Sequence, residues 1–210
     1  MRQQIPSLLQ GLVEKGVLLQ TKEEYRLQTA ESAEWEADLR KRMGSIRADE
    51  ARIASERSEE IQKAVRAALK SITLTQGSSK TPRKFQLYFG QEPPKIDNSE
   101  IPVWVQDEWM TTEKSMRESA QQVGVDSPIV FVFLPRRDAD ALREAVVSYH
   151  ATKDTLDTRP NPTTPGGYEA RQGMEFRRDG ARIDLTRLVT GLLNKARIFQ
   201  GGGHEISDDD

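Results

Sequence analysis

The chain has 210 residues, enough for one or two domains, and 30% of them are charged while 6% are aromatic. The absence of cysteine excludes disulfides, thiol catalysis and thiolate metal sites. The net charge is −2, so the chain as a whole does not attract nucleic acid and any such contact must come from a local basic patch.

No apolar stretch approaches the roughly 20 residues that a membrane-spanning helix needs, and no signal-peptide pattern opens the chain. The sequence therefore predicts a soluble, cytoplasmic protein without a membrane partner. A mean hydropathy of −0.68 also indicates that part of the chain is extended or solvated.

Residues 1–29 are predicted to form a partial winged helix. The apolar residues between Leu8 and Val13 follow helical spacing, Gly16 ends the helix, and two extended runs flank a polar turn at 21–24. A helix followed by a strand, a turn and a strand is typical of a recognition helix and its wing. Two helices that would cover Leu8 and Leu12 do not precede them. We therefore expect either a piece of a longer protein or a cover supplied by another chain.

Residues 30–72 are predicted to form one long charged helix, with Thr29 as its N-cap. Nine acidic and nine basic residues lie between Glu31 and Lys70, and no proline interrupts them. The helix is interpreted as a solvated spacer or half of a helical hairpin, and a coiled coil that self-associates is the alternative. The apolar stripes of this segment are Trp35, Leu39, Met43, Ile46 and Ile53, then Ile61, Val65, Ala68 and Ile72. The favourable i,i+4 pairs are Glu36–Arg40, Asp38–Arg42 and Glu59–Lys63.

Residues 73–84 are predicted to be a turn-rich linker with a short strand, and residues 85–203 a small α/β domain. Strands are expected at 85–89 and 102–106, followed by a helix that Thr111 or Thr112 caps and that runs to about Val123. The apolar run 128–134 is typical of a central strand covered by helices on both faces.

Two further helices are expected after the central strand. The first carries Leu142, Val146, Tyr149 and Leu156, and the second covers 168–196 although three glycines weaken its pattern. Residues 204–210 are expected to be a disordered acidic tail. The predicted fold is therefore a mixed α+β or α/β fold with a partial winged helix, a long charged helix and a small α/β domain.

The glycine-rich segments do not predict a nucleotide site. A P-loop needs GxxxxGK followed by Ser or Thr, and the chain does not contain this pattern. The segment 77–81 has a similar composition but lacks the second glycine, so we interpret it as a flexible linker. The triple glycine at 201–203 leads into no helix and is not a dinucleotide fingerprint.

The two imidazoles of the chain are His150, expected on a helix surface, and His204, expected in the acidic tail. Two histidines limit both general-base catalysis and metal binding. No catalytic residue and no metal site are predicted.

The best candidate site is an anion-binding site at Arg136, Arg137 and Asp138. These residues follow the buried strand, and α/β sheets bind ligands beyond the carboxyl ends of their strands. The alternative is two solvated arginines that precede an N-cap at Asp138.

A second candidate site would contact a nucleic-acid backbone. Lys80, Arg83 and Lys84 form a basic cluster without a nearby acid, and two aromatic residues follow within four positions. A solvated linker is the alternative. The candidates in the wing are Lys15, Lys22 and Arg26, which with Gln10 and Glu14 form a mixed-charge set that is weak for reading DNA.

Several segments of the chain together resemble a known family. They are GVLLQTKEEYRLQTAESAEWEADLRKR, LTQGSSKTPRKFQLYFG, IPVWVQDEW, DSPIVFVFLPRRDADALREAV, TLDTRPNPTTPGGYEARQGME and ARIFQGGGHE. In this order they resemble a segment of the large P-loop ATPase of bacteriophage exclusion (BREX) systems, the BrxC or PglY family. The similarity runs from about Leu8 to Glu205.

The resemblance implies an ATP- and magnesium-binding component of an anti-phage system that works beside a DNA methyltransferase and a phosphatase-like protein. The chain carries none of the family's nucleotide-binding motif, so no catalytic residue can be transferred to it. We expect neither a cofactor nor ATPase activity in this chain. Expected partners are the other BREX components and DNA, with self-association through residues 30–72.

Three functions follow from these observations as hypotheses. The first is a non-catalytic interaction segment of the BREX ATPase that positions partner proteins or DNA. The second is a stand-alone winged-helix regulator that binds DNA. The third is a small α/β enzyme with an anion site near Arg136.

Overall fold

The computed structural model describes residues 4–14, 18–21, 24–27, 29–95 and 100–206. Over these ranges the fold is mixed α+β, with six helices, one five-stranded sheet and two two-stranded sheets. The chain forms two compact units, residues 1–53 with 144–184 and residues 54–143 with 185–210. Each unit combines two segments that are distant in sequence, unlike the consecutive domains expected above. None of the described helices is long and apolar enough to cross a membrane.

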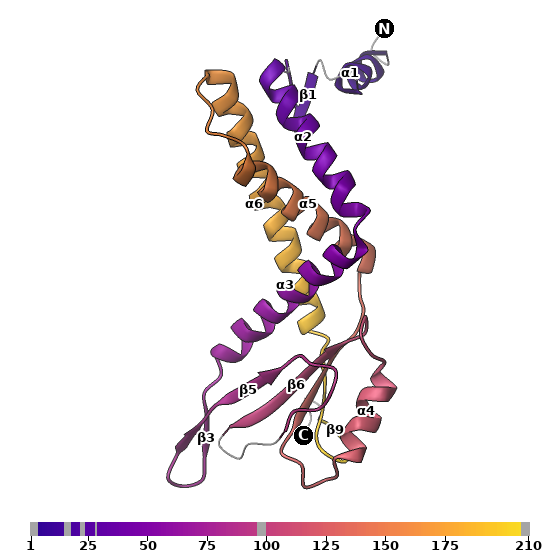
Figure 1. Cartoon of the computed structure of the whole chain (residues 1–210), viewed down its shortest axis with the longest axis vertical. Helices are drawn as coiled ribbons and strands as arrows, with labels where there is room; N and C mark the ends of the chain where they lie inside the picture. The colour runs from indigo at the N-terminus through magenta and orange to yellow at the C-terminus, as the bar shows by residue number, and fades with distance from the viewer. Residues whose placement is uncertain (1–3, 15–17, 22–23, 28, 96–99, 207–210) are drawn as a thin grey trace. The chain divides into compact units, whose positions relative to one another are not determined.

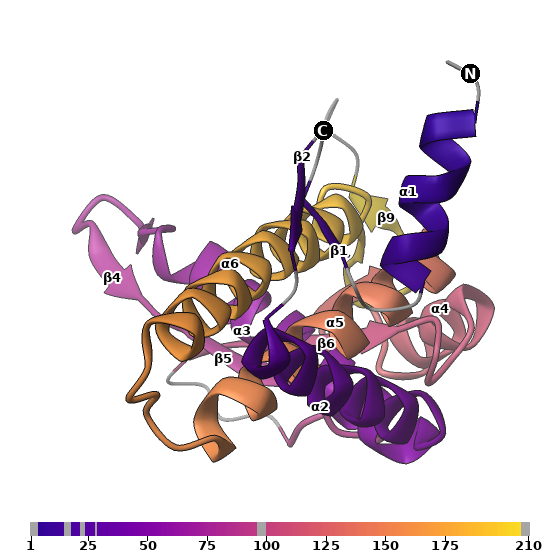
Figure 2. The same ribbon diagram turned by 90° about the horizontal axis from the view of Figure 1, so that it is seen from above.

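The N-terminal element has the order expected for a recognition helix and its wing. Helix α1 (Gln4–Glu14) precedes β1 (Leu18–Thr21) and β2 (Glu24–Leu27), and the two strands pair in antiparallel register with Leu18 opposite Leu27. Figure 2 shows this hairpin. The side chains of Leu8 and Leu12 on α1 are 66% and 37% exposed, so an apolar face of the helix is in contact with water.

The single helix expected at residues 30–72 is divided into α2 (Ala30–Arg47) and α3 (Glu50–Lys70). Thr29 caps α2 as predicted, because its Oγ1 accepts the backbone N–H of Ser32 at 3.1 Å. Asp49 provides a second cap, since its Oδ1 accepts the N–H of Arg52 at 2.9 Å. An aspartate at an N-cap favours a new helix start over continuation of the preceding helix.

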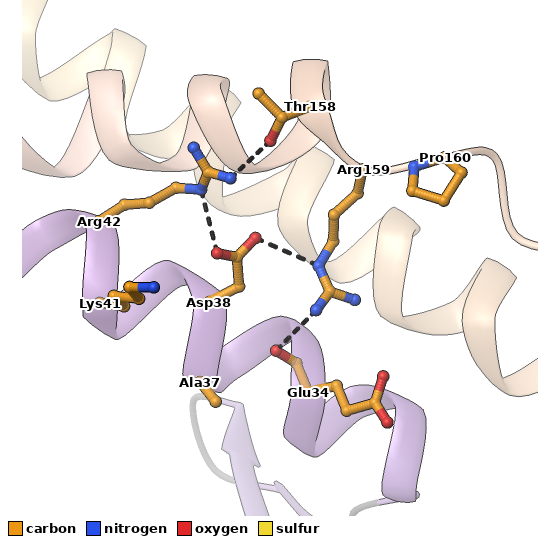
Figure 3. Close-up of a pocket in the computed structure, with 8 residues that line it drawn as sticks. All are labelled: Glu34, Ala37, Asp38, Lys41, Arg42, Thr158, Arg159 and Pro160. Carbon is orange, nitrogen blue, oxygen red and sulfur yellow. Dashed lines mark hydrogen bonds and ion pairs between the residues drawn. The ribbon is translucent and has the colours of Figure 1, made fainter.

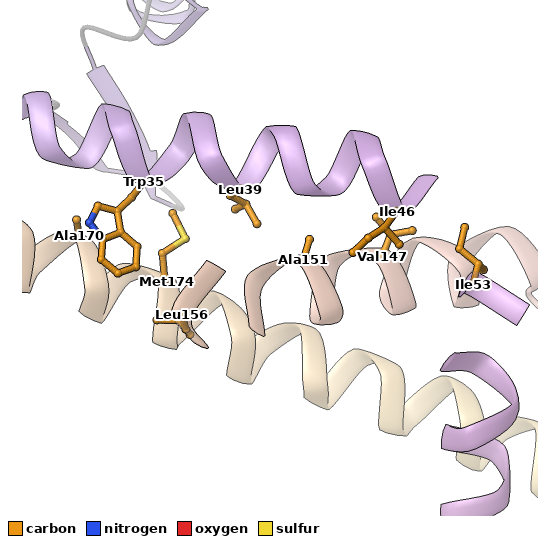
Figure 4. Packing of buried hydrophobic residues seen from close by; sticks show 9 residues of the cluster. All are labelled: Trp35, Leu39, Ile46, Ile53, Val147, Ala151, Leu156, Ala170 and Met174. Carbon is orange, nitrogen blue, oxygen red and sulfur yellow. The ribbon is translucent and has the colours of Figure 1, made fainter. Parts of the chain in front are cut away.

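The first unit is built around the apolar stripe of α2. Helix α2 lies beside α5 (Ala139–Thr158) and the first half of α6 (Pro165–Leu193) (Figures 1 and 2). The stripe predicted from the sequence is therefore covered by two other helices, which favours the helical-hairpin interpretation over a solvated spacer. The buried cluster (Figure 4) contains Trp35, Leu39, Ile46, Ile53, Val147, Ala151, Leu156, Ala170 and Met174.

The second unit contains the five-stranded sheet in the order β5-β6-β7-β8-β9. Strands β5 (Phe85–Tyr88), β6 (Ile101–Asp107) and β7 (Val130–Leu134) are parallel, whereas β8 (Arg197–Phe199) and β9 (Glu205–Ile206) continue the sheet in antiparallel pairs. Strand β7 is the middle strand, which confirms the prediction of a central strand from the apolar run at 128–134.

One face of the sheet packs against α4 (Glu113–Gln122), which Thr112 caps as predicted (Figure 1). Trp104 and Phe131 are register partners on this face, with ring centroids 5.6 Å apart. The α4 residues Met116 and Ala120 belong to the same buried cluster. Ile61 and Val65 of α3 are also buried in this unit. Of the second predicted stripe, however, Ala68 is exposed and Ile72 lies beyond the end of α3.

Residues 204–206 are more ordered than their composition predicts. Glu205 and Ile206 form β9, and Glu205 Oε1 accepts a hydrogen bond from Arg197 Nε at 2.7 Å. This hydrogen bond lowers the pKa of Glu205. The expectation of disorder is therefore corrected for 204–206, because pairing with β8 satisfies their backbone, while 207–210 lie outside the described residues.

The triple glycine at 201–203 is the turn between β8 and β9. Gly202 and Gly203 have φ angles of +87° and +79°, which residues with a Cβ atom rarely adopt. A Cβ atom at Gly201 would overlap the carbonyl oxygen of Gly124. The sequence is therefore explained by chain geometry, without a bound dinucleotide.

Candidate functional site: a basic groove

The predicted anion site lies at the carboxyl end of the central strand. Arg136, Arg137 and Asp138 are all exposed in the loop between β7 and α5. The carbonyl oxygen of Asp138 accepts the N–H of Leu142 at 2.8 Å, so Asp138 immediately precedes α5, while capping by its side chain stays a prediction. Its φ angle is +46°, a left-handed conformation that aspartate tolerates better than most residues.

The surroundings of this loop are not purely cationic. The backbone N–H of Arg136 donates to Glu108 Oε2 at 2.6 Å. The guanidinium of Arg136 lies 5.7 Å from the centroid of the Trp109 ring. The carboxylate of Glu108, which follows β6 and contacts this loop, opposes the approach of an anion. Anion binding at this loop therefore stays a prediction, and the geometry does not favour it over the solvated-arginine alternative.

The predicted nucleic-acid residues fall into a described and an undescribed group. Lys15 and Lys22 lie outside the described residues, and Arg26 is described only by its backbone in β2. Lys80, Arg83 and Lys84 belong to the second unit, where β3 (Leu74–Gln76) and β4 (Thr81–Arg83) form an antiparallel hairpin. Residues 77–80 form the turn of this hairpin and Thr81 begins β4, so the segment is not a flexible linker. Gly77 and Lys80 in the turn adopt φ angles of +69° and +50°.

A groove of about 470 Å³ lies where the end of α3, the hairpin and β5 meet. Two of the three predicted cations, Arg83 and Lys84, line it, whereas Lys80 is exposed in the hairpin turn. The groove, called the basic groove below, is lined by Arg66, Leu69, Lys70, Ile72, Thr73, Leu74, Pro82, Arg83, Lys84, Phe85 and Leu87.

The charge of the basic groove has one sign. Four of its lining residues are cations and none is acidic. Arg66 and Lys70 were missed by sequence reasoning because they belong to α3, where their spacing of four residues places them on one helix face. The guanidinium of Arg66 lies 5.1 Å from the centroid of the Phe89 ring, a cation–π contact that holds this side chain in place.

The apolar side chains in the lining of the basic groove are called its floor below, and its four cations are called its rim. Ile72 and Leu74 are 48% and 37% exposed, and Leu69, Phe85 and Leu87 are half-buried. Exposed apolar side chains rimmed by polar groups are typical of interaction surfaces. The groove therefore combines a surface that favours apolar contact with a rim that attracts negative charge.

A second hollow, of about 660 Å³, lies in the first unit between α2 and the end of α5 (Figure 3). Asp38 lies between two arginines there, 3.2 Å from Arg42 Nε and 3.2 Å from Arg159 Nε. Arg159 also donates to the carbonyl oxygen of Glu34 at 3.1 Å and stacks over Trp35. These charges are paired with one another, so we interpret this hollow as the surface of a helix contact.

A third hollow, of about 300 Å³, lies on the α4 side of the sheet. Its lining holds no ionisable side chain, and it consists of Gln91, Trp104, Gln106, Met110, Thr111, Met116 and Ser119. The side-chain N–H groups of Trp104 and Gln106 both donate to the carbonyl oxygen of Gly90. These donors therefore serve the local fold.

The histidines are placed differently from the prediction. His150 is 7% exposed and lies against the ring of Tyr149 with centroids 5.0 Å apart, so the expectation of a surface histidine is wrong. The reason is that α5 is buried over more than one stripe, as the fully buried Thr152 and Thr155 show. His204 is exposed beside β9. No three His, Asp or Glu side chains are grouped as a metal site over the described ranges.

No protein-family model matches the chain, and neither a curated protein nor a solved structure is detectably similar to it.

Proposed function

We propose that this chain is a non-catalytic interaction segment that holds an anionic partner in the basic groove. The observation that carries the proposal is the lining of the groove, which combines four cations with apolar side chains and contains no carboxylate. Charges of one sign in a concave site concentrate the field and attract groups of the opposite sign. The setting is the one that the resemblance implies, a cytoplasmic P-loop ATPase of a BREX system.

The titratable groups of the structure support a binding role over a catalytic one. Catalysis by acid and base needs two such groups within reach of one substrate position. Asp107 is a buried carboxyl with a raised pKa. It accepts a backbone hydrogen bond from Trp109, which gives it a role in the local fold. The rim of the basic groove carries cations alone, which suits recognition of charge and supplies no acid–base pair.

Retention of the purified protein on heparin resin tests the proposal, because heparin is a polyanion. The variant Arg83→Ala/Lys84→Ala should elute at clearly lower salt than wild type, since each cation contributes to the salt dependence of binding. The matched control is Lys114→Ala/Lys195→Ala, which removes the same charge from exposed positions of the same unit. Equal elution of both variants would argue against a specific role of the groove.

The non-catalytic part of the proposal has its own measurement. ATP turnover by the purified chain should equal the buffer background with and without magnesium. Turnover that is abolished by Arg136→Ala/Arg137→Ala would contradict a non-catalytic role and favour an enzyme with an anion site in that loop. The BREX assignment is tested by co-purification of the chain with the methyltransferase and the phosphatase-like protein of such a system.

DNA is the second candidate partner, and the position of Lys80 favours it. Lys80 is exposed in the turn before β4, so it adds a third cation to Arg83 at the end of β4 and Lys84 after it. Cations that lie close together in the chain suit phosphate contacts. A salt-dependent mobility shift of duplex DNA, lost in Lys80→Ala/Arg83→Ala/Lys84→Ala, would support this function. No shift at low salt would reject it.

A further inference from the structure

We infer that the basic groove takes an acidic, amphipathic peptide segment of a partner protein, with bulky apolar side chains on its floor and carboxylates on its rim. The inference depends on the proposed function above and names the class of partner. The floor indicates apolar groups in the partner, and the rim indicates negatively charged groups.

The floor requires an apolar ligand group. Ile72 and Leu74 are 48% and 37% exposed, and both line a hollow of about 470 Å³. This volume lies within the range of about 300–1,000 Å³ that is typical of ligand pockets. Apolar surface that is removed from water stabilises a complex, so a ligand with leucine or phenylalanine side chains binds more tightly than one without them.

The rim favours anionic groups such as carboxylates. Arg66 and Lys70 lie on α3, while Arg83 and Lys84 lie at the end of β4 and before β5, so cations come from two elements that line the groove. Arg66 is held against the ring of Phe89, and a planar guanidinium presents paired N–H donors that match a carboxylate. The lining contains no acid that would compete for these donors.

A nucleic-acid strand matches the groove less well. Its phosphates could meet the rim, but its backbone has no apolar group to cover Ile72 and Leu74. Single-strand binders stack bases on aromatic side chains, and the lining of the groove includes one aromatic residue, the half-buried Phe85. An acidic peptide with apolar side chains is complementary to both the floor and the rim.

Fluorescence anisotropy with the full chain and three labelled probes tests the inference. The probes are a peptide of alternating glutamate and leucine, the same peptide with serine in place of leucine, and a single-stranded oligo-dT of similar charge. The glutamate–leucine peptide should bind at least about tenfold more tightly than either of the others, because it alone buries apolar surface.

Two variants of the floor separate this inference from simple charge attraction. Ile72→Ser and Leu74→Ser should each weaken the glutamate–leucine peptide by roughly tenfold and leave the serine peptide unchanged. Both side chains are partly exposed, so the fold tolerates the change. Ile183→Ser, at a residue 68% exposed in the other unit, is the control and should leave all affinities unchanged.

The outcomes distinguish the partner class from the proposed function. If oligo-dT or the serine peptide binds as tightly as the glutamate–leucine peptide, or if the floor variants change nothing, the peptide inference is overturned while anion binding stands. If none of the three probes binds at low salt, both the inference and the proposed function fall.

Discussion

Asp107 accepts the backbone N–H of Trp109 through Oδ1 at 3.0 Å, and its carbonyl oxygen accepts the N–H of Met110 at the same distance. The residue thus shapes the turn that follows β6. Its carboxyl is buried, and desolvation raises its pKa although the Trp109 hydrogen bond and the charge of Arg57 act in the opposite direction. The turn therefore needs the acceptor oxygen more than the negative charge.

This relationship predicts how Asp107→Asn responds to pH. A raised pKa means that the Asp107 carboxyl binds its proton more tightly in the folded state than in the unfolded state. The wild type therefore loses stability as pH rises from the pKa of the carboxyl in the unfolded state through its pKa in the folded state. Asparagine keeps the acceptor and carries no charge. Urea unfolding at about pH 4 and about pH 7 should therefore show the stability of Asp107→Asn, relative to wild type, increasing with pH.

Asp107→Ala is the control for the turn itself. It removes both the charge and the acceptor, so it should be less stable than Asp107→Asn by about 1 kcal/mol at neutral pH. If the alanine and asparagine variants have the same stability at every pH, the hydrogen bond to Trp109 is not the function of this residue.

The ion pair between Arg159 and Asp38 should contribute measurably to the first unit. Arg159→Ala removes this pair, the hydrogen bond to the Glu34 carbonyl and the stacking over Trp35, and should lower the free energy of unfolding by about 1–2 kcal/mol. Arg159→Lys should recover only part of the loss, because lysine lacks the planar guanidinium.

An exposed pair on α5 provides the comparison for Arg159. Lys153 lies 2.7 Å from Asp157 with both side chains about half exposed, and Lys153→Ala should cost no more than about 0.5 kcal/mol. Denaturant unfolding followed by circular dichroism measures all three variants. Equal losses for Lys153→Ala and Arg159→Ala would show that the contacts across helices add nothing.

The glycines of the second half of the chain should respond oppositely to alanine. Gly201→Ala places a Cβ atom against the Gly124 carbonyl oxygen and 3.0 Å from Ser127 Cβ, so we expect a loss of about 1–3 kcal/mol. Gly173→Ala adds a Cβ atom that meets nothing within 4 Å on α6, and should gain about 0.5–1 kcal/mol. Thermal unfolding of both variants checks the signs. A destabilised Gly173→Ala would contradict a regular, solvated helix face there.

The boundary between α2 and α3 should depend on the side chain of Asp49. Asp49→Ala removes the acceptor for the Arg52 N–H and should cost about 1 kcal/mol, whereas Asp49→Ser should retain most of the stability. Amide hydrogen exchange of residues 50–53 is the direct measurement, because a lost cap exposes the first N–H groups of α3. Unchanged protection in the alanine variant would show that packing alone holds this helix start.

Local chemistry explains why many elements could be predicted from the sequence. The caps at Thr29 and Thr112, the alternating strand at β5 and the apolar run of β7 depend on neighbours within a few residues, so their signals are contained in short windows. The break at Asp49 was missed because the charged, helix-favouring residues on both sides continue the same pattern across it.

Partner choice could not be predicted in the same way. Glu36 forms an ion pair with Arg177 of α6 at 2.8 Å. The sequence predicts a different partner for Glu36, the i,i+4 residue Arg40. The burial of His150 likewise depends on helices that cover more than one side of α5. These contacts join residues far apart in the chain, so the periodicity of the sequence within one segment does not indicate them.

The sequence by itself determined most of the helices and strands, the central strand and a cationic cluster at Arg83 and Lys84. Only the tertiary structure decided that Arg66 and Lys70 join this cluster around an apolar floor. The physical reason is that a side chain's own periodicity fixes its place on a helix or strand, whereas a groove is formed by elements that meet only when the chain folds. The function proposed for the chain depends on that meeting of α3 with the β3–β4 hairpin and β5.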